Sequence, residues 1–562
     1  MPANDRVASD TDKPEERANW PEQAEWVDAA PSAALVERRT RDHFAVLLQV
    51  ARDGERSFFD FERRLSPLVF TLGRLLLALF LTRRHERLQT VPSEILDGNR
   101  YERRTPQGRW LGTFFGKVRY WRTYMYGPDG GYHPLDRELG LPSDGFSAHL
   151  TGLMARLATK MSYATAKVML HCFLSWSPST TTIEHAVLGL GRRTKAWFEH
   201  APAPEGDGEV LVIEIDGKSP PTATEAELKK RRGKRKRARV PGSPRHRGSK
   251  RQKGRRKGKR RGAKTGRGED SPRHRSREKR KQRGKKARRK KGDKSKNGRM
   301  VTVLVMFTLK KGVDEKGNPV LIGPINRRVY ASYGPKRHAF AIARREADKR
   351  GFKRGSGKTV QLVTDGDEDL ERYGKEFFPE AIHTLDIFHV VEHLWAAGRS
   401  LHREGSTALE EWVDEQRRRL YRGHVRAIIR DLQTALDAVP PTGPGNKGKR
   451  KRLQEVVTYL DKRVHMMNYK ELLELDLEIC SGSVEGAVRY VVSQRFDCAG
   501  MRWIRERAEA LLQLRCVEIN GDWDEFMAFV QNTGPGNANA PPSETRLLAS
   551  ESEQLPTLGV AA

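Results

Sequence analysis

Apolar runs of strand length alternate with amphipathic stretches in the middle of the chain. Three apolar runs come first, at Val210–Ile215, Met300–Leu309 and Pro324–Tyr333. They are followed by "KRHAFAIARREADKRG", a helical pattern that ends at Gly351, and by "TVQLVTDG", which predicts a fourth strand. A helix in "LERYGKEFF" and a short fifth strand in "AIHTLDIF" complete the series.

This order of elements is that of a ribonuclease-H-like α/β core, and helical patterns follow it. From about His393 to Leu475 the chain is predicted to be all-α. Two final helices are predicted at Val484–Gln494 and Arg502–Cys516. The all-α region contains an apolar stripe at helical spacing, formed by Leu453, Val456, Val457, Leu460 and Val464.

The region before the core is predicted to be mainly helical. The run "PLVFTLGRLLLALFLT", which begins at Pro67, is too short for a membrane span and contains Arg74, so it predicts a core helix. The β-formers in "GKVRYWRTYMYGPDGGYHPL" are interrupted at residues 127–130 and predict a hairpin. A helix from near Ser162, a break at residues 175–177 and a second helix with Pro178 in its first turn are typical of a helix-turn-helix DNA-binding unit or of an ordinary helical hairpin.

The positive charge of the chain is concentrated in one segment. Residues 229–299 contain 38 Lys and Arg against 4 Asp and Glu, whereas the rest of the chain contains 68 of each, so this segment carries the whole formal net charge of +34. Because it has almost no apolar side chains to bury, it predicts a long disordered basic insertion between the first two strands. Its natural partner is a polyanion such as double-stranded DNA, and a nonspecific basic segment is the alternative.

The pattern of cysteines indicates a reducing compartment. No Cys-x-x-Cys pair occurs, which argues against a zinc ribbon and a secreted disulfide framework. The first residues are polar and acidic rather than signal-like. The four cysteines are Cys172, Cys480, Cys498 and Cys516.

Three acidic residues stand where metal ligands could converge. Asp216 follows the first strand and Asp365 the fourth, so parallel pairing of these strands would bring both to one sheet edge, where α/β proteins bind ligands. Glu485 borders the apolar face of a later helix, and three such carboxylates can hold two Mg²⁺ or Mn²⁺ ions. Alternatively, Asp216-Gly217 and Asp365-Gly366 are turn dipeptides, and Glu485 is a first-turn residue favoured by the helix dipole.

Two long motifs resemble a known family. The runs "LVTDGDEDLERYGKEFFPEAIHTLDIFHVVEHLW" and "SGSVEGAVRYVVSQRFDCAGMRWIRERAEALLQLRCVEINGDWDEF" resemble the bacterial insertion-sequence DDE transposases of the Mutator-like group, ISKra-type family. The resemblance covers much of the chain from Asp216 to Phe526, apart from the basic segment. It implies a ribonuclease-H-like core, a helical insertion before the last acid, and a DDE triad formed by Asp216, Asp365 and Glu485.

The same resemblance draws attention to "LDIFHVV", where many Mutator-type transposases have Cys-x-x-His and this chain has Asp386 and His389. Asp386 is expected to be an additional metal ligand or to support one. His389 is expected near the scissile phosphate or a flipped base, or else to hydrogen-bond within the core. Three tryptophans could stack on DNA ends or pack internally, namely Trp395, Trp412 and Trp503.

Together these features predict a transposase that cuts transposon ends and joins the 3′-hydroxyls to target DNA, using two Mg²⁺ or Mn²⁺ ions. We expect it to act as a homodimer or higher oligomer on double-stranded DNA in the bacterial cytoplasm, associated with the nucleoid and not with a membrane. The alternatives are a noncatalytic DNA-binding regulator derived from a transposase and a ribonuclease-H-like nuclease without strand transfer.

The predicted regions are a flexible tail (1–40), an N-terminal region with the hairpin and the helix-turn-helix-like unit (41–200), the ribonuclease-H-like core (205–228 with 300–392), the disordered basic insertion (229–299), the helical insertion (393–475), the C-terminal catalytic helices (476–532) and a second tail (533–562).

Overall fold

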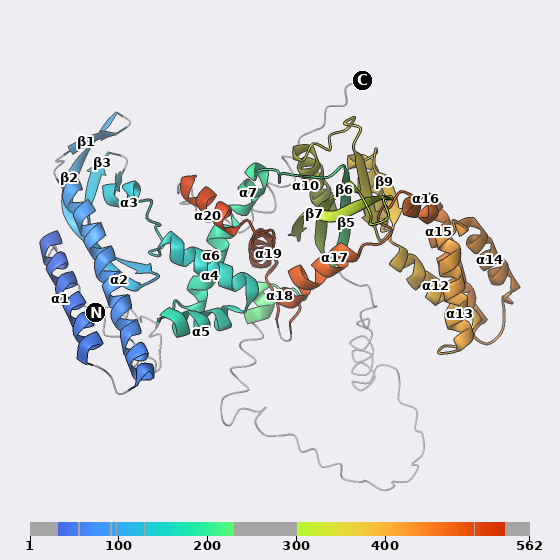
Figure 1. The fold of residues 1–562 in the computed structure, drawn as a ribbon, viewed down its shortest axis with the longest axis horizontal. Helices are drawn as coiled ribbons and strands as arrows, with labels where there is room; N and C mark the ends of the chain where they lie inside the picture. The colour runs from blue at the N-terminus through green and yellow to red at the C-terminus, as the bar shows by residue number, and fades with distance from the viewer. Residues whose placement is uncertain are drawn as a thin grey trace, which may run out of the picture. The chain divides into compact units, whose positions relative to one another are not determined.

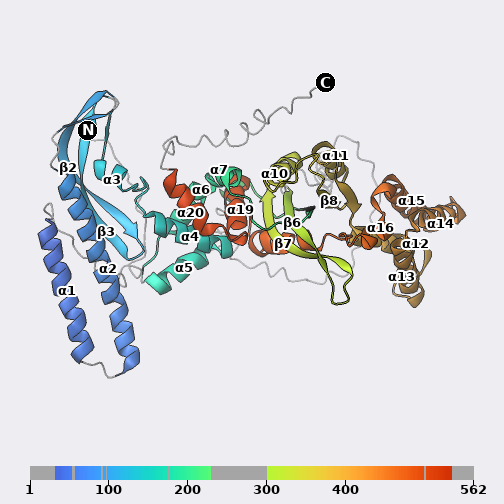
Figure 2. The ribbon, with the colours of Figure 1, turned by 45° about the horizontal axis from the view of Figure 1, so that its top comes forward.

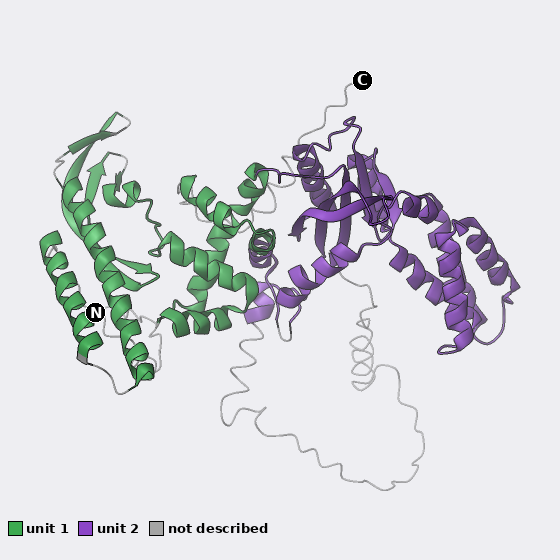
Figure 3. Cartoon of the chain, viewed as in Figure 1, with its two compact units in different colours: residues 1–201, 513–562 green, residues 202–512 purple. Residues whose placement is uncertain are grey.

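The computed structural model describes residues 32–533, apart from residues 54–56, 90–92, 97, 129, 175, 230–299 and 499–500. The chain divides into two compact units, residues 1–201 with 513–562 and residues 202–512 (Figure 3). The predicted C-terminal region 476–532 is therefore shared between the units. The predicted basic insertion from residue 230 on, the first tail up to residue 31 and the second tail from residue 534 on lie outside the described residues.

The first unit contains a four-stranded antiparallel sheet in the order β1-β2-β3-β4 (Figure 1). The strands are β1 (Ser93–Leu96), β2 (Asn99–Thr113), β3 (Gly116–Gly127) and β4 (Gly130–Tyr132). The predicted hairpin is confirmed as β3–β4, but the sequence pattern missed β2, which is the longest strand of this sheet. The helices of this unit are α1 (Ala33–Asp53), α2 (Phe58–Leu88), α3 (Pro134–Glu138), α4 (Ala148–Lys160), α5 (Tyr163–Leu174), α6 (Thr180–Gly191), α7 (Thr194–His200) and α20 (Trp523–Asn532).

The boundaries of two helices correct the sequence predictions. The first tail does not extend to residue 40, because α1 begins at Ala33. The pair α5 and α6 confirms the predicted helices around residues 175–177, but Pro178 does not lie in the first turn of α6. Ser179 is the N-cap of this helix, and its side chain accepts a hydrogen bond from the Thr182 N–H.

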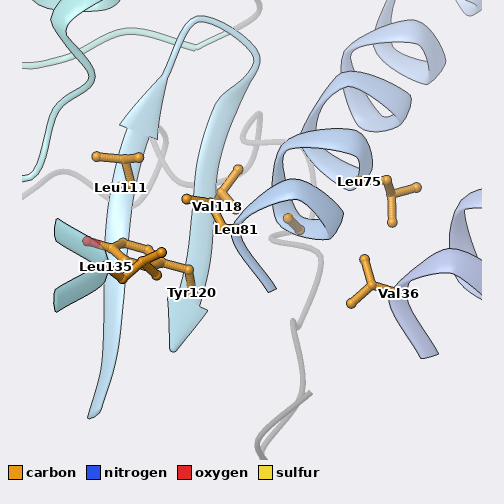
Figure 4. Close-up of a cluster of buried hydrophobic side chains, with 8 residues drawn as sticks. Val36, Leu75, Leu81, Leu111, Val118, Tyr120 and Leu135 are labelled. Atoms are coloured by element: carbon orange, nitrogen blue, oxygen red, sulfur yellow. The ribbon is translucent and has the colours of Figure 1, made fainter. Parts of the chain in front are cut away.

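Helix α2 packs against both α1 and β3. Figure 4 shows its residue Leu75 beside Val36 of α1 and its residue Leu81 beside Val118 of the β2–β3 ribbon, whose Leu111 and Tyr120 belong to the same buried cluster. The helix has 31 residues, which is more than the apolar run that predicted it. By length and composition alone it could cross a membrane, and 28% of its apolar 18-residue window is buried inside the protein. The length argument against a membrane span was therefore wrong, and the predicted core helix is buried only in part.

The second unit is built on a mixed five-stranded sheet in the order β7-β6-β5-β8-β9, so the protein belongs to the mixed α/β class. Strand β5 pairs antiparallel with β6 and parallel with β8, β6 pairs antiparallel with β7, and β8 pairs parallel with β9. All five predicted strands are present. They are β5 (Val210–Lys218), β6 (Val301–Val313), β7 (Pro319–Ser332), β8 (Thr359–Thr364) and β9 (Ile382–Leu385).

Helices connect and cover this sheet. Helix α10 (Lys336–Lys349) packs on β6 and β7, and α11 (Glu368–Phe377) packs on β8. The predicted helical insertion is present as a bundle whose 3₁₀ turn packs on β9, and Figure 2 shows its helices grouped together. Its helices are α12 (Ile387–Leu401), α13 (Thr407–Tyr421), α14 (Val425–Ala438), α15 (Asn446–Lys462), the 3₁₀ turn η2 (Val464–Met466) and α16 (Tyr469–Glu474). The bundle begins six residues earlier than predicted, because β9 ends at Leu385 and α12 starts at Ile387.

The last predicted helices are also present. The segment expected as Val484–Gln494 consists of α17 (Gly482–Ala487), a π-helical turn η3 (Val488–Ser493) and α18 (Gln494–Phe496). Helix α17 packs on β5 and β6 through its buried residues Val484 and Ala487. The helix expected at Arg502–Cys516 is α19 (Arg505–Ile519), and the division between the two units falls within it.

Candidate active site

The register of the sheet places three aspartates in one row. Glu214 of β5 pairs with Val363 of β8, and Val363 pairs with Thr384 of β9. Residues two positions further along each strand are Asp216, Asp365 and Asp386. Asp216 lies inside β5 on the same face as Glu214, because side chains alternate along a strand, and Asp365 and Asp386 directly follow β8 and β9, so all three lie at the carboxyl ends of three parallel strands. The predicted meeting of Asp216 and Asp365 at one edge is thus confirmed.

Asp216 belongs to a strand and not to a turn. It pairs with Val303, and Gly217 pairs with Thr302, so both residues lie inside the β5–β6 ladder. A Cβ atom at Gly217 would approach the Met300 sulfur to 2.5 Å, so a larger residue there would require the Met300 side chain to move. The turn interpretation of this Asp-Gly pair is therefore wrong.

The loop after β8 is held by the helical insertion. The Tyr459 hydroxyl of α15 donates a hydrogen bond to the Asp365 carbonyl oxygen at 2.9 Å, and the buried Arg463 donates to the Gly366 carbonyl oxygen at 2.8 Å. Gly366 has a φ angle of +75°, which favours glycine, and a Cβ atom there would meet Arg463 at 2.7 Å. Asp365-Gly366 is thus a turn in its backbone, but one that fixes the Asp365 carboxylate at the sheet edge.

Asp386 is the N-cap of α12 and orients His389. One of its carboxylate oxygens accepts from the Phe388 N–H at 3.0 Å, and the other accepts from His389 Nδ1 at 2.8 Å and from the Ser481 hydroxyl at 2.6 Å. Burial opposes ionisation of Asp386, but these hydrogen bonds outweigh it and hold its pKa below the ordinary value. The hydrogen bond to Asp386 raises the pKa of His389 to about 9, so this imidazole is a cation at neutral pH.

Glu214 connects the strand of Asp216 to the helix of Glu485. Its side chain is 1% exposed, and its carboxyl group accepts a hydrogen bond from the Val484 N–H at 2.6 Å. The Ser481 side chain, which would ordinarily cap α17, is engaged by Asp386 instead. Glu214 therefore satisfies an N-terminal N–H group of the helix that carries Glu485.

The carboxyl groups at this edge influence each other. Burial raises the pKa of Asp216 and the Gly217 N–H opposes this shift, whereas the nearby charges of Asp365 and Asp386 raise the pKa further. Glu485 lies in the first turn of α17 with an exposed side chain. Among the described residues, no three His, Cys, Asp or Glu side chains are close enough together to hold a metal ion, so Glu485 is not gathered with the two aspartates.

The donor set nevertheless suits a hard divalent cation. Asp216 and Asp365 are partly exposed carboxylates on adjacent parallel strands, and oxygen ligands of this kind are those that Mg²⁺ and Mn²⁺ prefer. Asp386 differs, because both of its oxygens already accept hydrogen bonds from protein groups. Asp386 is thus placed to orient the His389 ring through their hydrogen bond.

The three tryptophans contact protein groups. Trp503 packs against Phe496 with ring centroids 5.0 Å apart, and its indole N–H donates to the Phe496 carbonyl oxygen. Trp412 lies against Gly398, where a Cβ atom would come within 3.1 Å of its ring. Trp395 has the Arg399 guanidinium 5.7 Å from its ring centroid. These contacts favour the packing interpretation over stacking on DNA.

The pattern analysis missed the residues that hold the site together. Glu214 had a visible signal, since it is the one charged residue within the apolar run "VLVIEI", and a buried charge requires a partner. Ser481, Tyr459 and Arg463 had no comparable signal, because their partners are close only in the folded chain. No protein-family model matches the chain, and the search of curated proteins found no matching relative.

Proposed function

We propose that the protein is a DNA transposase with a ribonuclease-H-like core, which cuts transposon ends and joins the resulting 3′-hydroxyls to target DNA. Three antiparallel strands followed by two parallel strands with intervening helices support this core. The resemblance of the two long motifs to the insertion-sequence transposases supports the reaction class. The substrate would be double-stranded DNA, acted on by a homodimer or higher oligomer in the bacterial cytoplasm.

One observation carries the proposal. Asp216 lies in β5 and Asp365 directly follows β8, the parallel neighbour of β5, and Glu214 of β5 also holds the α17 helix that carries Glu485. Two strands and one helix thus contribute the three acids, as the family resemblance implies. A fold that only required turns at these positions would not have Asp216 inside a paired strand.

Asp216 and Asp365 would hold Mg²⁺ or Mn²⁺, with Glu485 completing the set after a movement of its exposed side chain. Such ions, when bound in pairs, neutralise charge on the attacking and leaving oxygens of a phosphodiester. The protonated His389 would donate a hydrogen bond to a phosphate oxygen of the DNA from the same edge. Asp386 would keep the His389 ring oriented, and Tyr459 and Arg463 would keep the Asp365 loop in place.

The position of Glu485 also favours a second candidate, a noncatalytic DNA-binding regulator derived from a transposase. Its side chain is exposed and is not gathered with the aspartates among the described residues. The two candidates differ in a single measurable property, which is metal-dependent cleavage of DNA.

The test uses purified full-length protein and a labelled duplex that carries the DNA flanking the gene. Asp216→Asn, Asp365→Asn and Glu485→Gln should each abolish Mg²⁺-dependent cleavage and strand transfer while binding of the duplex is retained. Because the three acids act as one unit, the double aspartate variant should be little worse than either single variant.

Glu368→Gln is the matched control, because Glu368 is an exposed acid in the first turn of α11, close in sequence to Asp365. It should cleave like the wild type. Cleavage that survives Asp216→Asn or Asp365→Asn would remove that residue from the site. Absence of cleavage by the wild type in both Mg²⁺ and Mn²⁺, with intact DNA binding, would favour the regulator. Cleavage without strand transfer would favour a nuclease.

A further inference from the structure

The β2–β3 ribbon of the first unit has two different faces. Leu111, Val118 and Tyr120 lie on one face and are buried against α2 and α3 (Figure 4). The opposite face carries Trp110 and Trp121 with Arg119 between them. Trp110 pairs with Arg119 across the strands, and Gly108 pairs with Trp121, so these four residues share one face.

The guanidinium group of Arg119 lies against both indoles. Its central carbon is 6.0 Å from the ring centroid of Trp110 and 5.1 Å from that of Trp121. Gly108 makes this arrangement possible, because a Cβ atom there would come within 3.1 Å of Arg119 Nε and 3.4 Å of the Trp121 ring. A larger residue at position 108 would require the Arg119 guanidinium to shift from its place between the indoles.

Around Trp110 this face is exposed, whereas at Gly112 the rings of Phe146 and Trp176 lie against it. Trp110 is 42% exposed, although an indole of this size usually becomes buried in a monomer. Lys117 on the same face is exposed, and the indole nitrogen of Trp121 is shielded from solvent without a hydrogen-bond partner. The neighbouring positions on this face, from Gly108 to Gly112 and from Lys117 to Trp121, contain no acidic residue.

We propose that Trp110, Arg119 and Trp121 form a platform that stacks unpaired bases of a DNA strand, with Lys117 and Arg119 contacting its phosphates. Exposed indoles with an interleaved guanidinium are the groups that bind single strands, since every base offers a π face. A duplex hides its base faces, so it could use only the two cations. The platform is a property of the first unit and does not depend on the reaction proposed for the second.

The test measures binding of the full-length protein to a labelled single-stranded oligonucleotide and to the corresponding blunt duplex by fluorescence anisotropy. Salt well above the physiological concentration suppresses phosphate contacts, including those of the basic segment, but leaves stacking largely intact. Trp110→Ala should weaken single-strand binding by about five- to a hundredfold, the range for loss of one stacked base, and change duplex binding by less than about twofold. Trp110→Phe should retain most of the affinity.

Gly108→Val gives an independent variant, because it leaves both indoles in the chain but displaces Arg119; it should also lose single-strand affinity selectively. Tyr126→Ala is the control, since Tyr126 is an exposed aromatic residue of β3 with Arg104 over its ring, outside the proposed platform. Equal losses for both DNA forms would show a purely electrostatic surface and overturn the stacking proposal. Unchanged single-strand binding by Trp110→Ala and Gly108→Val, with near-ultraviolet circular dichroism like that of the wild type, would overturn it as well.

Discussion

Glu214 should make the second unit less stable as the pH rises. Burial raises the pKa of this carboxyl group to about 8, and the hydrogen bond that it accepts from the Val484 N–H offsets the rise only in part. The ordinary pKa of glutamate is 4.5, and one pKa unit corresponds to about 1.4 kcal/mol, so the difference amounts to about 5 kcal/mol. Glu214 is thus mainly protonated in the folded protein at neutral pH and ionised in the unfolded chain.

The sign follows from this difference. Below about pH 4.5 both states are protonated and Glu214 imposes no cost on folding. As the pH rises from there through about 8, the unfolded chain gains the free energy of ionisation and the folded protein does not. The unfolding free energy should therefore fall by up to about 5 kcal/mol across this window, with about 3 kcal/mol already lost at pH 7.

Glu214→Gln should remove this dependence, because the amide oxygen can still accept from Val484 but cannot ionise. Urea titrations between about pH 5 and pH 9 in the presence of a chelator, read by hydrogen exchange of peptides from β5 and α17, would report the unfolding of the second unit. The variant should match the wild type at the acidic end and exceed its stability increasingly toward the alkaline end. Glu214→Leu also cannot ionise, but it leaves the buried Val484 N–H without an acceptor. Its unfolding free energy should therefore be about 1–3 kcal/mol lower than that of Glu214→Gln.

Glu315→Gln is the control for a general effect of charge removal, because Glu315 is an exposed glutamate between β6 and β7. It should follow the pH dependence of the wild type. A Glu214→Gln variant that is less stable than the wild type by the same margin at every pH would refute the reasoning. It would mean that Glu214 is ionised in the folded protein and that its charge, and not its oxygen, stabilises the α17 helix.

Two further predictions concern the site and the basic segment. His389→Ala should slow cleavage by about 10- to 100-fold without a comparable loss of stability in the second unit. Cleavage by the wild type should decline as the pH rises through about 9, where His389 loses its proton. An unchanged cleavage rate per folded molecule in His389→Ala would support a purely structural histidine. Replacing residues 229–299 by a short Gly/Ser linker should leave the core folded, because β5 and β6 are antiparallel neighbours that need only a turn to pair. It should also flatten the dependence of log K on log salt by about 0.9 for each lost phosphate contact. An unchanged salt slope, or loss of discrimination between transposon-end and random DNA with general affinity intact, would contradict a segment that binds DNA backbone without reading bases.

Elements with a strong local pattern could be predicted from the sequence, and elements whose ends depend on distant partners could not. The continuous apolar run Val210–Ile215 predicts a strand that is buried on both faces, and β5 is such a strand. The boundary between β9 and α12 was misplaced, because "AIHTLDIF" has no local break. The strand ends where Asp386 caps α12, and Asp386 is held there by Ser481 from a segment 95 residues away.

The candidate site shows the same division. Asp216 and Asp365 could be found because each follows an apolar run, and their meeting needed only the assumption of parallel pairing. The exposed position of Glu485 could not be foreseen, since it depends on how α17 is tethered to β5. The strand β2 was missed because its "NRYERRTPQGRW" portion is polar and has no clear alternation of apolar and polar residues. This portion forms a strand because it pairs with β3, which is rich in aromatic residues.

The sequence by itself determined the order of strands and helices in the second unit, the location of the net charge and the positions of Asp216 and Asp365 after apolar runs, because these follow from local periodicity and composition. Only the tertiary structure decided which groups support the acids. Glu214 meets Val484, Ser481 meets Asp386, and Tyr459 and Arg463 meet the Asp365 loop across separations of about 100 residues or more. Such contacts form because buried polar groups must find partners, and chain folding, not sequence distance, sets which partner is within reach.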